Sequence, residues 1–346
     1  MSGSESLYRC NPRQIRDFVK EILYAGLVPF VKGSPGVGKS SIFGSVAEEL
    51  ALWMIDHRLS TSDPTDLNGL PNFVNGMARF APFQELFPLE NTPLPDGKQG
   101  WMIFLDEFNS AKKDVQAASY KVILDRMIGQ HKLHPNVVLC LAGNLDTDRA
   151  LTNTISTALQ SRVVHLELEV DFDIWMQDVA LKRNYDPRII AFLSQYNSLL
   201  MDFRPDHNEK TFCCPRTWDF LNSIIKDKPV TEDRAPLYAG TISSGVAVQF
   251  IQFTKIYQNL ITVPEILRDP DNALVPGDTS LRWATITAML EKVDEKNFSK
   301  LATYANRYPL DFRILFFRAV LIQHPELRQH PAFGTAMREL ARYLND

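Results

Sequence analysis

Eight consecutive residues near the N-terminus have the types and spacing of a loop that holds phosphate groups. They are Gly33, Ser34, Pro35, Gly36, Val37, Gly38, Lys39 and Ser40, and they fit the pattern G-x-x-x-x-G-K-[ST]. Glycines let the backbone curl so that successive N–H groups point at phosphate oxygens, and the N-terminus of a following helix adds partial positive charge. We expect Lys39 to reach the β- and γ-phosphates of a nucleotide and Ser40 to ligate Mg²⁺ through its hydroxyl.

The segments on either side of this loop have the patterns of a strand and a helix. Residues 28–31 indicate a short buried strand, and residues 41–52 have the spacing of an amphipathic helix. Residues 52–59 then indicate a second strand, which gives the βαβ beginning of a parallel sheet. The loop therefore lies between a strand and a helix, as phosphate binding requires.

A second stretch with chemical potential is Trp101-Met102-Ile103-Phe104-Leu105-Asp106-Glu107. Its apolar run ends in two carboxylates, as expected for a central parallel strand that delivers acids to its carboxyl edge, where ligands of open α/β sheets bind. We expect Asp106 to hold Mg²⁺, directly or through water, and Glu107 to orient the attacking water. The alternative is a strand that simply ends in solvated acids.

A third polar residue, Asn144, ends another apolar run, residues 137–144. A side-chain amide at that position can donate to the γ-phosphate or hold the attacking water. Asn144 alone is equally typical of a turn after Gly143. Between the second and third stretches, residues 109–124 indicate a helix and residues 125–135 a small hairpin that turns near Gly129.

Residues 73–80 contain Asn-Gly between apolar residues, which is a strong hairpin signal. Such a hairpin would interrupt the second helix of the α/β core. It is either a surface excursion or a functional loop, and the local pattern does not choose between them.

The remaining chain changes from strand to helix patterns. A strand at residues 163–168 would complete a five-stranded parallel sheet, and helical spacing begins past Val170. The expected helices cover residues 174–181, 188–201, 215–221, 239–257, 283–293, 298–306, 310–321 and 331–344. The loop at residues 269–278 marks a linker. We therefore expect an α/β nucleotide-binding core at residues 1–170, a helical lid at 171–260 and a C-terminal helical extension at 261–346.

Composition limits the class of partner and the compartment. The 346 residues carry a net charge of −4, which argues against a surface coated with nucleic-acid-binding charge, although a local basic groove can hide in that average. The four cysteines show no C-x-x-C spacing, which suits neither a disulfide framework nor a zinc site. No signal peptide and no run of about eighteen apolar residues is present, so we expect a cytoplasmic protein without a membrane partner.

In this order the motifs resemble the AAA+ ATPases, and within them the MoxR-like group of the helix 2 insert clade, which is related to the dynein-type ATPase domains. The resemblance covers roughly residues 10–255 and rests on GSPGVGKS, MIFLDE, LAGN, LQSRV and CPRTW. It implies ATP and Mg²⁺ as cofactors. It matches Asn144 to sensor 1, Arg162 to the arginine finger, with Arg149 as the competing finger, and Arg216 to the sensor 2 arginine of a lid helix.

The resemblance also implies a homo-oligomer, a ring of six subunits, because an arginine on the subunit edge would reach a neighbour's γ-phosphate. The hairpins at residues 73–80 and 126–135 correspond to inserts that face a central pore in relatives. In many relatives one residue couples ligand binding to the catalytic glutamate. We cannot assign a match for that residue in this sequence.

The leading hypothesis is a ring-forming ATPase that remodels or activates a protein partner, in relatives often a von Willebrand factor A domain protein. A second hypothesis is a nucleic-acid-acting motor or loader, which basic residues near the second hairpin favour. These are Lys112, Lys113, Arg126, His131, Lys132 and His134. A third is a nucleotide-gated assembly switch with incidental turnover, against which Glu107 and Arg162 argue.

Overall fold

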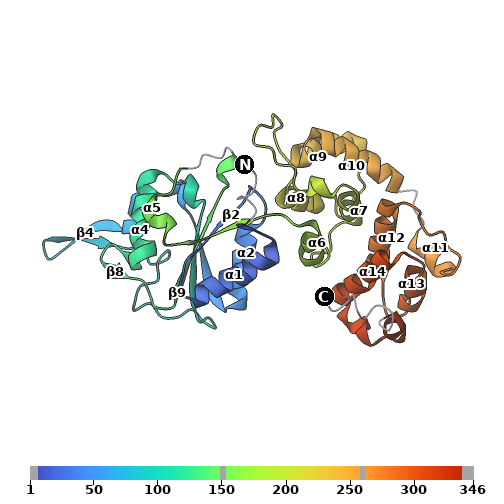
Figure 1. Ribbon diagram of the computed structural model, residues 1–346, viewed down its shortest axis with the longest axis horizontal. Helices are drawn as coiled ribbons and strands as arrows, with labels where there is room; N and C mark the ends of the chain where they lie inside the picture. Colours follow the sequence, from blue (N-terminus) through green and yellow to red (C-terminus); the bar gives the residue numbers. More distant parts are fainter. Residues whose placement is uncertain (1–6, 149–152, 258–261, 337–346) are drawn as a thin grey trace. The chain divides into compact units, whose positions relative to one another are not determined.

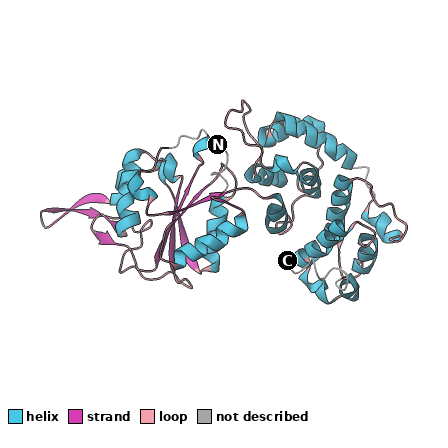
Figure 2. Cartoon of the chain, in the orientation of Figure 1, coloured by secondary structure: helices cyan, strands magenta, loops and turns pink. Residues whose placement is uncertain are grey.

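The computed structural model describes residues 7–148, 153–257 and 262–336 (Figure 1). The chain divides into two compact units: residues 1–171 with 203–207, and residues 172–202 with 208–346. Figure 2 shows that the strands belong to the first unit and that the described elements of the second are helices. The finer division into core, lid and C-terminal extension remains a prediction.

The first unit is built on a six-stranded parallel sheet in the order β1-β10-β2-β9-β6-β3. The strands are β1 (Arg9–Cys10), β2 (Pro29–Lys32), β3 (Leu52–Arg58), β6 (Gly100–Asp106), β9 (Val137–Gly143) and β10 (Val164–Leu168). The expected α/β class with a parallel sheet is confirmed, but the sheet has one strand more than the five expected. The extra strand β1 pairs with β10 over only two residues, too few for a period-two pattern.

Helices cover both faces of this sheet, with α1 (Pro12–Tyr24) and α2 (Lys39–Glu49) on one side and α4 (Lys113–Asp125) and α5 (Thr157–Gln160) on the other (Figure 1). Every residue of β6 is buried, as expected for a central strand covered on both faces. Phe104 lies 4.7 Å from Phe43 of α2 between ring centroids, whereas Ile103 shares a buried cluster with Val115 of α4. This alternation fixes the direction in which β6 delivers its terminal acids.

Both expected hairpins are present in the first unit. They are β4 (Leu70–Val74) with β5 (Met77–Ala81), and β7 (Met127–Ile128) with β8 (His131–Lys132). Asn75 and Gly76 connect the first pair with φ of 52° and 73°, the left-handed conformations that a two-residue hairpin turn requires. A Cβ on Gly129 would lie 2.9 Å from the Phe80 Cβ, and His131 Nε2 lies 3.1 Å from the Phe80 carbonyl oxygen, so the two hairpins pack together.

The second unit is helical throughout its described elements. Its helices of at least six residues are α7 (Pro187–Gln195), α8 (Pro215–Ile225), α9 (Ala235–Ile242), α10 (Ser244–Tyr257), α11 (Val263–Arg268), α12 (Thr279–Lys292), α13 (Phe298–Ala305) and α14 (Leu310–Gln323). The second unit also contains the short helix α6 (Phe172–Trp175), which a π-helical turn extends to Ala180. The remaining short helix, α3 (Pro64–Asn68), lies in the first unit. Within the described residues no helix has the length and apolar character needed to cross a membrane.

Several of the expected helices have different bounds in the structure. The single helix expected at residues 239–257 is broken at Ser243, whose φ of 80° lies outside the helical region, so α9 and α10 are separate. The helix expected at 188–201 ends at Gln195 and is followed by a 3-10 turn at Asn197–Leu200. Residues 331–336 are helical, and the rest of the helix expected up to residue 344 lies outside the described residues.

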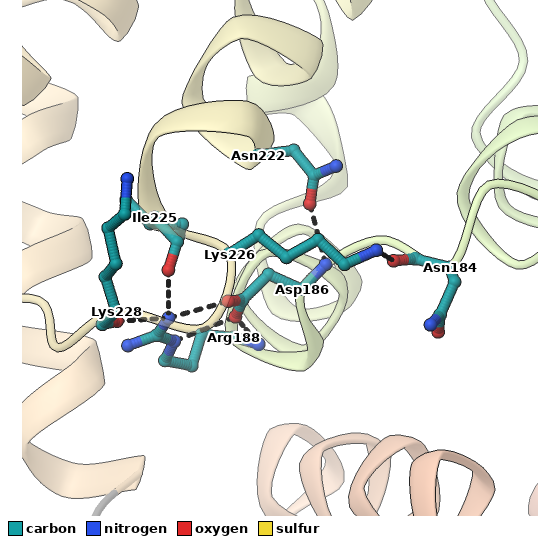
Figure 3. Close-up of polar contacts among 7 residues, drawn as sticks. All are labelled: Asn184, Asp186, Arg188, Asn222, Ile225, Lys226 and Lys228. Carbon is teal, nitrogen blue, oxygen red and sulfur yellow. Dashed lines mark hydrogen bonds and ion pairs between the residues drawn. The ribbon is translucent and has the colours of Figure 1, made fainter.

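A network around the ion pair of Asp186 and Arg188, of which Asp186 is buried, joins the start of α7 to the end of α8 (Figure 3). Asp186 caps α7 and accepts two hydrogen bonds from the Arg188 guanidinium, at 2.8 and 2.6 Å. The same guanidinium donates to the Ile225 and Lys228 carbonyl oxygens at 2.9 Å each. Asn222 of α8 accepts from the Asp186 backbone N–H at 2.7 Å. The network therefore satisfies the C-terminal carbonyls of α8 and the N-terminus of α7 together.

We expect Arg188→Met to destabilise the chain by about 3 kcal/mol or more, because it leaves the Asp186 carboxylate buried without its partner. The matched control is Arg183→Met, which removes the exposed ion pair with Asp219 and should change the unfolding free energy by less than about 1 kcal/mol. Urea unfolding followed by circular dichroism measures both. Equal effects of the two substitutions would contradict the structural role of the Arg188 network.

Candidate active site

The phosphate-loop residues form a tight turn between β2 and α2 in the structure. Gly36 and Gly38 have φ of 78° and 98°, a region that side chains with a Cβ rarely adopt. Helix α2 begins at Lys39, directly after Gly38, so its unpaired N-terminal N–H groups face the loop. A Cβ on Gly33 would lie 3.2 Å from the Leu168 carbonyl oxygen of β10. The conformation is the one that a phosphate cradle needs.

Lys39 lies inside this loop and contacts the neighbouring strand end. Its ammonium donates to the Gly33 carbonyl oxygen at 2.5 Å and to the Ser34 carbonyl oxygen at 3.2 Å. It also lies 3.4 Å from Asn144 Oδ1. Asn144 follows β9, and β9 lies between β2 and β6 in the sheet. The sheet order therefore places Asn144 between the loop and the acidic strand.

Ser40 and Asp106 form the candidate Mg²⁺ position. Ser40 Oγ lies 3.4 Å from Asp106 Oδ2, and Asp106 is buried at the end of β6. A hydroxyl and a carboxylate at this spacing are hard oxygen ligands of the kind that Mg²⁺ takes together with water and phosphate oxygens. In the part of the chain that the structure describes, no group of three or more His, Cys, Asp or Glu side chains is placed to hold a metal without such help. The residues thus fit a nucleotide-bound Mg²⁺ rather than an all-protein metal cage.

Glu107 has a strained backbone and a defined partner. Its φ of 54° lies in the left-handed region, which costs a residue other than glycine about 1–3 kcal/mol and is a feature of functional sites. Its backbone N–H donates to Asp106 Oδ1 at 2.7 Å, and its carboxylate accepts a hydrogen bond from the Ser60 hydroxyl. Ser60 lies in the 3-10 turn Leu59–Thr61 that follows β3.

Ser60 is a site residue that sequence reasoning missed. It lies in a turn that carries no motif, and only the pairing of β3 with β6 brings it to Glu107. Its hydroxyl holds the Glu107 carboxylate in one orientation, and the sequence offered no candidate for such a contact.

Asn109 is the second residue that the sequence did not reveal. It is fully buried, its amide donates to the Asn144 carbonyl oxygen at 2.8 Å, and its Oδ1 accepts from the Asn144 N–H at 2.9 Å. A Cβ on Gly143 would lie 2.4 Å from Asn109 Oδ1, so the close approach requires glycine there. Asn109 thus fixes the backbone of Asn144, while Asn144 Nδ2 lies 3.3 Å from Ser110 Oγ.

We expect Asn109→Ala to lower ATP turnover by about 10- to 100-fold, because the Asn144 N–H and carbonyl lose their partners and the side chain loses its position. Nucleotide affinity should change much less, since the phosphate loop is untouched. Steady-state turnover and equilibrium binding of a fluorescent nucleotide separate the two effects. Equal losses in binding and turnover would argue against a positioning role for Asn109.

The acidic edge of the sheet carries a third carboxylate, Asp56 of β3. Burial raises the pKa of Asp56, and the neighbouring Asp106 carboxylate raises it further. Burial lowers the pKa of the adjacent His57. Ser62 Oγ donates to the Arg58 carbonyl oxygen, so His57 Nε2, 2.9 Å from Ser62 Oγ, is the donor in that pair. The concentration of negative charge at Asp56 and Asp106 favours binding of a cation.

Of the three arginines considered from the sequence, the structure describes Arg162 and Arg216. Arg162 is exposed after α5 and donates to the Ala158 carbonyl oxygen at 2.6 Å, a local contact. Arg216 is exposed at the second position of α8 and belongs to the other unit. Arg149 lies outside the described residues. Their roles as finger and sensor remain predictions.

Comparisons with known proteins give weak similarities to solved structures. No family model matches the chain, and no curated protein sequence matches it. A RuvB variant from Thermotoga maritima is 18% identical with a TM-score of 0.38, and the match covers 75% of this chain and 77% of that one. A putative ATPase from Cytophaga hutchinsonii is 15% identical with a TM-score of 0.37, covering 94% and 88%. Thermotoga maritima RuvB, titled a Holliday junction branch migration motor, is 17% identical with a TM-score of 0.35, covering 75% of each chain.

The fold assignment therefore depends on the chain's own sheet and loop. A parallel sheet flanked by helices carries the phosphate loop after β2, the acidic pair after β6 and Asn144 after the intervening β9, and helices follow in the second unit. The fold class is α/β, with a parallel sheet flanked by helices and a phosphate loop after β2. In this core the loop and the acidic strand meet at the carboxyl edge of the sheet, where ligands of open α/β sheets bind.

Proposed function

We propose that the chain is an Mg²⁺-dependent ATP hydrolase. One observation carries the proposal: side chains that follow three separate strands, β2, β6 and β9, meet at one edge of the sheet. Lys39 lies 3.4 Å from Asn144, and Ser40 lies 3.4 Å from Asp106, to which Glu107 is joined through its backbone N–H. This is the set of groups that in-line attack of water on a γ-phosphate requires, and no covalent intermediate is needed.

In this mechanism the loop N–H groups and Lys39 hold the phosphates and offset their charge. Bound Mg²⁺, held by Ser40 and Asp106, supplies further charge neutralisation. Glu107 accepts a proton from the attacking water once its carboxylate is released from Ser60. Asn144, fixed by Asn109, donates from its amide to the γ-phosphate or the water. The hydrogen bond between Ser60 and Glu107 therefore separates a resting from an active position of the base.

We further propose the MoxR-like subgroup and a ring of six subunits in which Arg162 of one subunit completes the site of its neighbour. The exposure of Arg162 on the core supports this, because its guanidinium is accessible to a second chain. In this proposal Arg216, exposed at the start of α8, would follow the nucleotide state from the lid. The site would then be complete only in the assembled ring.

A protein is the proposed partner, with a von Willebrand factor A domain protein as the family-level candidate. The β4–β5 hairpin supports a protein contact, because Phe73 is 75% exposed and Met77 is 58% exposed. Nucleic acid is less favoured: the Arg126 guanidinium, one of the basic groups near the second hairpin, is bonded to the Val137 carbonyl oxygen. A basic side chain that is already hydrogen-bonded to a backbone carbonyl of the same chain adds little to a phosphate-binding surface.

ATP turnover measured against protein concentration, with the molar mass followed by light scattering, tests the ring. We expect turnover per subunit to rise as the mass increases from one subunit to the ring, because each site needs a neighbour. Turnover by a monomer that does not depend on concentration would remove the shared site. Assembly on ATP with negligible turnover would favour the switch hypothesis.

A further inference from the structure

Asp148 is a buried carboxylate beside the phosphate loop, and the mechanism above does not use it. It ends the 3-10 turn Asp146–Asp148 that follows β9 and Asn144, and it is only 7% exposed. Its side chain lies within electrostatic reach of Ser34, the second residue of the loop, and of Lys39. Asp148 is therefore at the phosphate end of the candidate site.

The turn that carries Asp148 is held against the loop at several points. Asp146 forms an ion pair with Lys32 at the end of β2, with 2.9 Å between Oδ2 and Nζ. Asn144 Oδ1 lies 3.4 Å from the Lys39 ammonium, and the Asp148 N–H donates to the Leu145 carbonyl oxygen at 3.1 Å. These contacts hold the turn that carries the carboxylate beside the loop.

One oxygen of this carboxylate, Oδ2, is buried and has no hydrogen-bond partner among the described residues. An unsatisfied buried polar atom destabilises the folded chain, so native structures retain few of them without a functional reason. Burial raises the pKa of Asp148, whereas the Ser34 hydroxyl and the Lys39 ammonium lower it. Lys39 is the charged side chain that acts on Asp148 in the part of the chain that the structure describes, since Lys32 is paired with Asp146.

Binding of a triphosphate would change the balance of charge around Asp148. The Lys39 ammonium would then interact with the phosphates, and an ionised Asp148 carboxylate would lie close to their negative charge. Ionised Asp148 would repel the nucleotide, whereas neutral Asp148 would offer an O–H donor at the atom that now has no partner.

We propose that Asp148 is a phosphate-binding residue that takes up one proton when the nucleotide binds and donates it from Oδ2 to a phosphate oxygen. The proton comes from the solvent buffer, the buffer base is left deprotonated, and no bond of the nucleotide is broken. The inference rests on the proposed function only in requiring that the loop binds a nucleotide. Because binding consumes a proton, nucleotide affinity falls as the pH rises from the free toward the bound pKa of Asp148, by up to about tenfold per pH unit.

Titration calorimetry of the full chain with Mg²⁺ and a non-hydrolysable ATP analogue tests the proposal, at about pH 7.5 in two buffers of different ionisation enthalpy. The difference in heat between buffers gives the protons taken up per site. We expect the native chain to take up about half a proton or more beyond Asp148→Asn, whose amide has nearly the same shape as the carboxylate but cannot ionise. Subtracting the variant cancels protons exchanged by the nucleotide itself.

Glu85→Gln is the matched control, because it neutralises an exposed carboxylate outside the site and should keep the native proton uptake. Should Asp148→Asn fail to fold, Asp148→Ser replaces it, since its hydroxyl also accepts a hydrogen bond and does not titrate in this range. Equal uptake by the native chain and the Asp148 variant, with nucleotide bound by both, would overturn the role of Asp148 alone. Absence of nucleotide binding by the native chain would overturn the proposed function as well.

Discussion

Glu107→Gln should lower ATP turnover by about 10²- to 10⁴-fold while the chain still binds ATP, because the amide cannot accept the proton of the attacking water. The phosphate loop, Lys39 and Asp106 are unchanged by the substitution, and the amide can still accept a hydrogen bond from Ser60. Phosphate release and equilibrium binding of ATP, measured on one preparation, give both quantities.

Glu85→Gln is the control for this prediction, since Glu85 is exposed and outside the site. Its turnover should stay within about twofold of the native value. If Glu107→Gln retained native turnover, Glu107 would not be the base. If it lost ATP binding as well, the residue would serve the architecture of the site rather than the chemistry.

Arg162→Ala should lower turnover in the assembled ring by about 10³-fold or more, the range in which an arginine supplied from a neighbouring subunit acts. Stability should hardly change, because the exposed guanidinium makes only a local hydrogen bond to Ala158. Turnover at a protein concentration where light scattering shows the full ring is the measurement. If an assembled Arg162→Ala ring hydrolysed ATP at the native rate, Arg162 would not be the arginine finger. Arg149 would then be the candidate for that role.

A mixing experiment separates a shared site from a site within one chain. Arg162→Ala keeps its own Glu107, and Glu107→Gln keeps its own Arg162, so a mixed ring contains some sites with both groups. We expect the mixture to be more active than either variant alone, up to about a quarter of the native rate if subunits mix at random. No gain on mixing, in rings shown to exchange subunits, would place both groups in the same chain.

The sequence was sufficient to predict the α/β fold class, the turn at the phosphate loop and the strand that ends in acids, because their signals are local. The glycine pattern around Lys39 dictates a loop conformation, and the apolar run before Asp106 identifies a central strand that ends in acids. The Asn75-Gly76 turn has a similarly local cause, since its positive φ angles require those residue types.

Ser60, Asn109 and Asp148 could not be found in the same way, because their roles arise from tertiary contacts. Ser60 meets Glu107 only through the pairing of β3 with β6, and Asn109 meets Asn144 across 35 residues of chain. Asp148 is a candidate phosphate-binding residue because it is buried near Ser34 of the loop, and residue spacing in the sequence does not indicate this burial. A polar residue in a turn normally indicates solvent exposure, so these three look ordinary in the sequence.

The sheet and helix bounds show the same distinction between local and tertiary causes. Strand β1 exists because two residues pair with β10, and the break between α9 and α10 depends on the single dihedral angle of Ser243. Neither feature leaves a periodic pattern for sequence reasoning to detect. The subgroup, the ring and the partner depend on other chains and remain proposals.

The most direct test of the central claim is Mg²⁺-dependent release of phosphate from ATP by the native chain beside Lys39→Ala. The account predicts turnover by the native chain that disappears with a chelator, and a Lys39→Ala chain that folds normally but neither binds nor hydrolyses ATP measurably. Equal phosphate release by the two chains would show that the loop at Lys39 is not where ATP is hydrolysed, and the proposed function would be wrong.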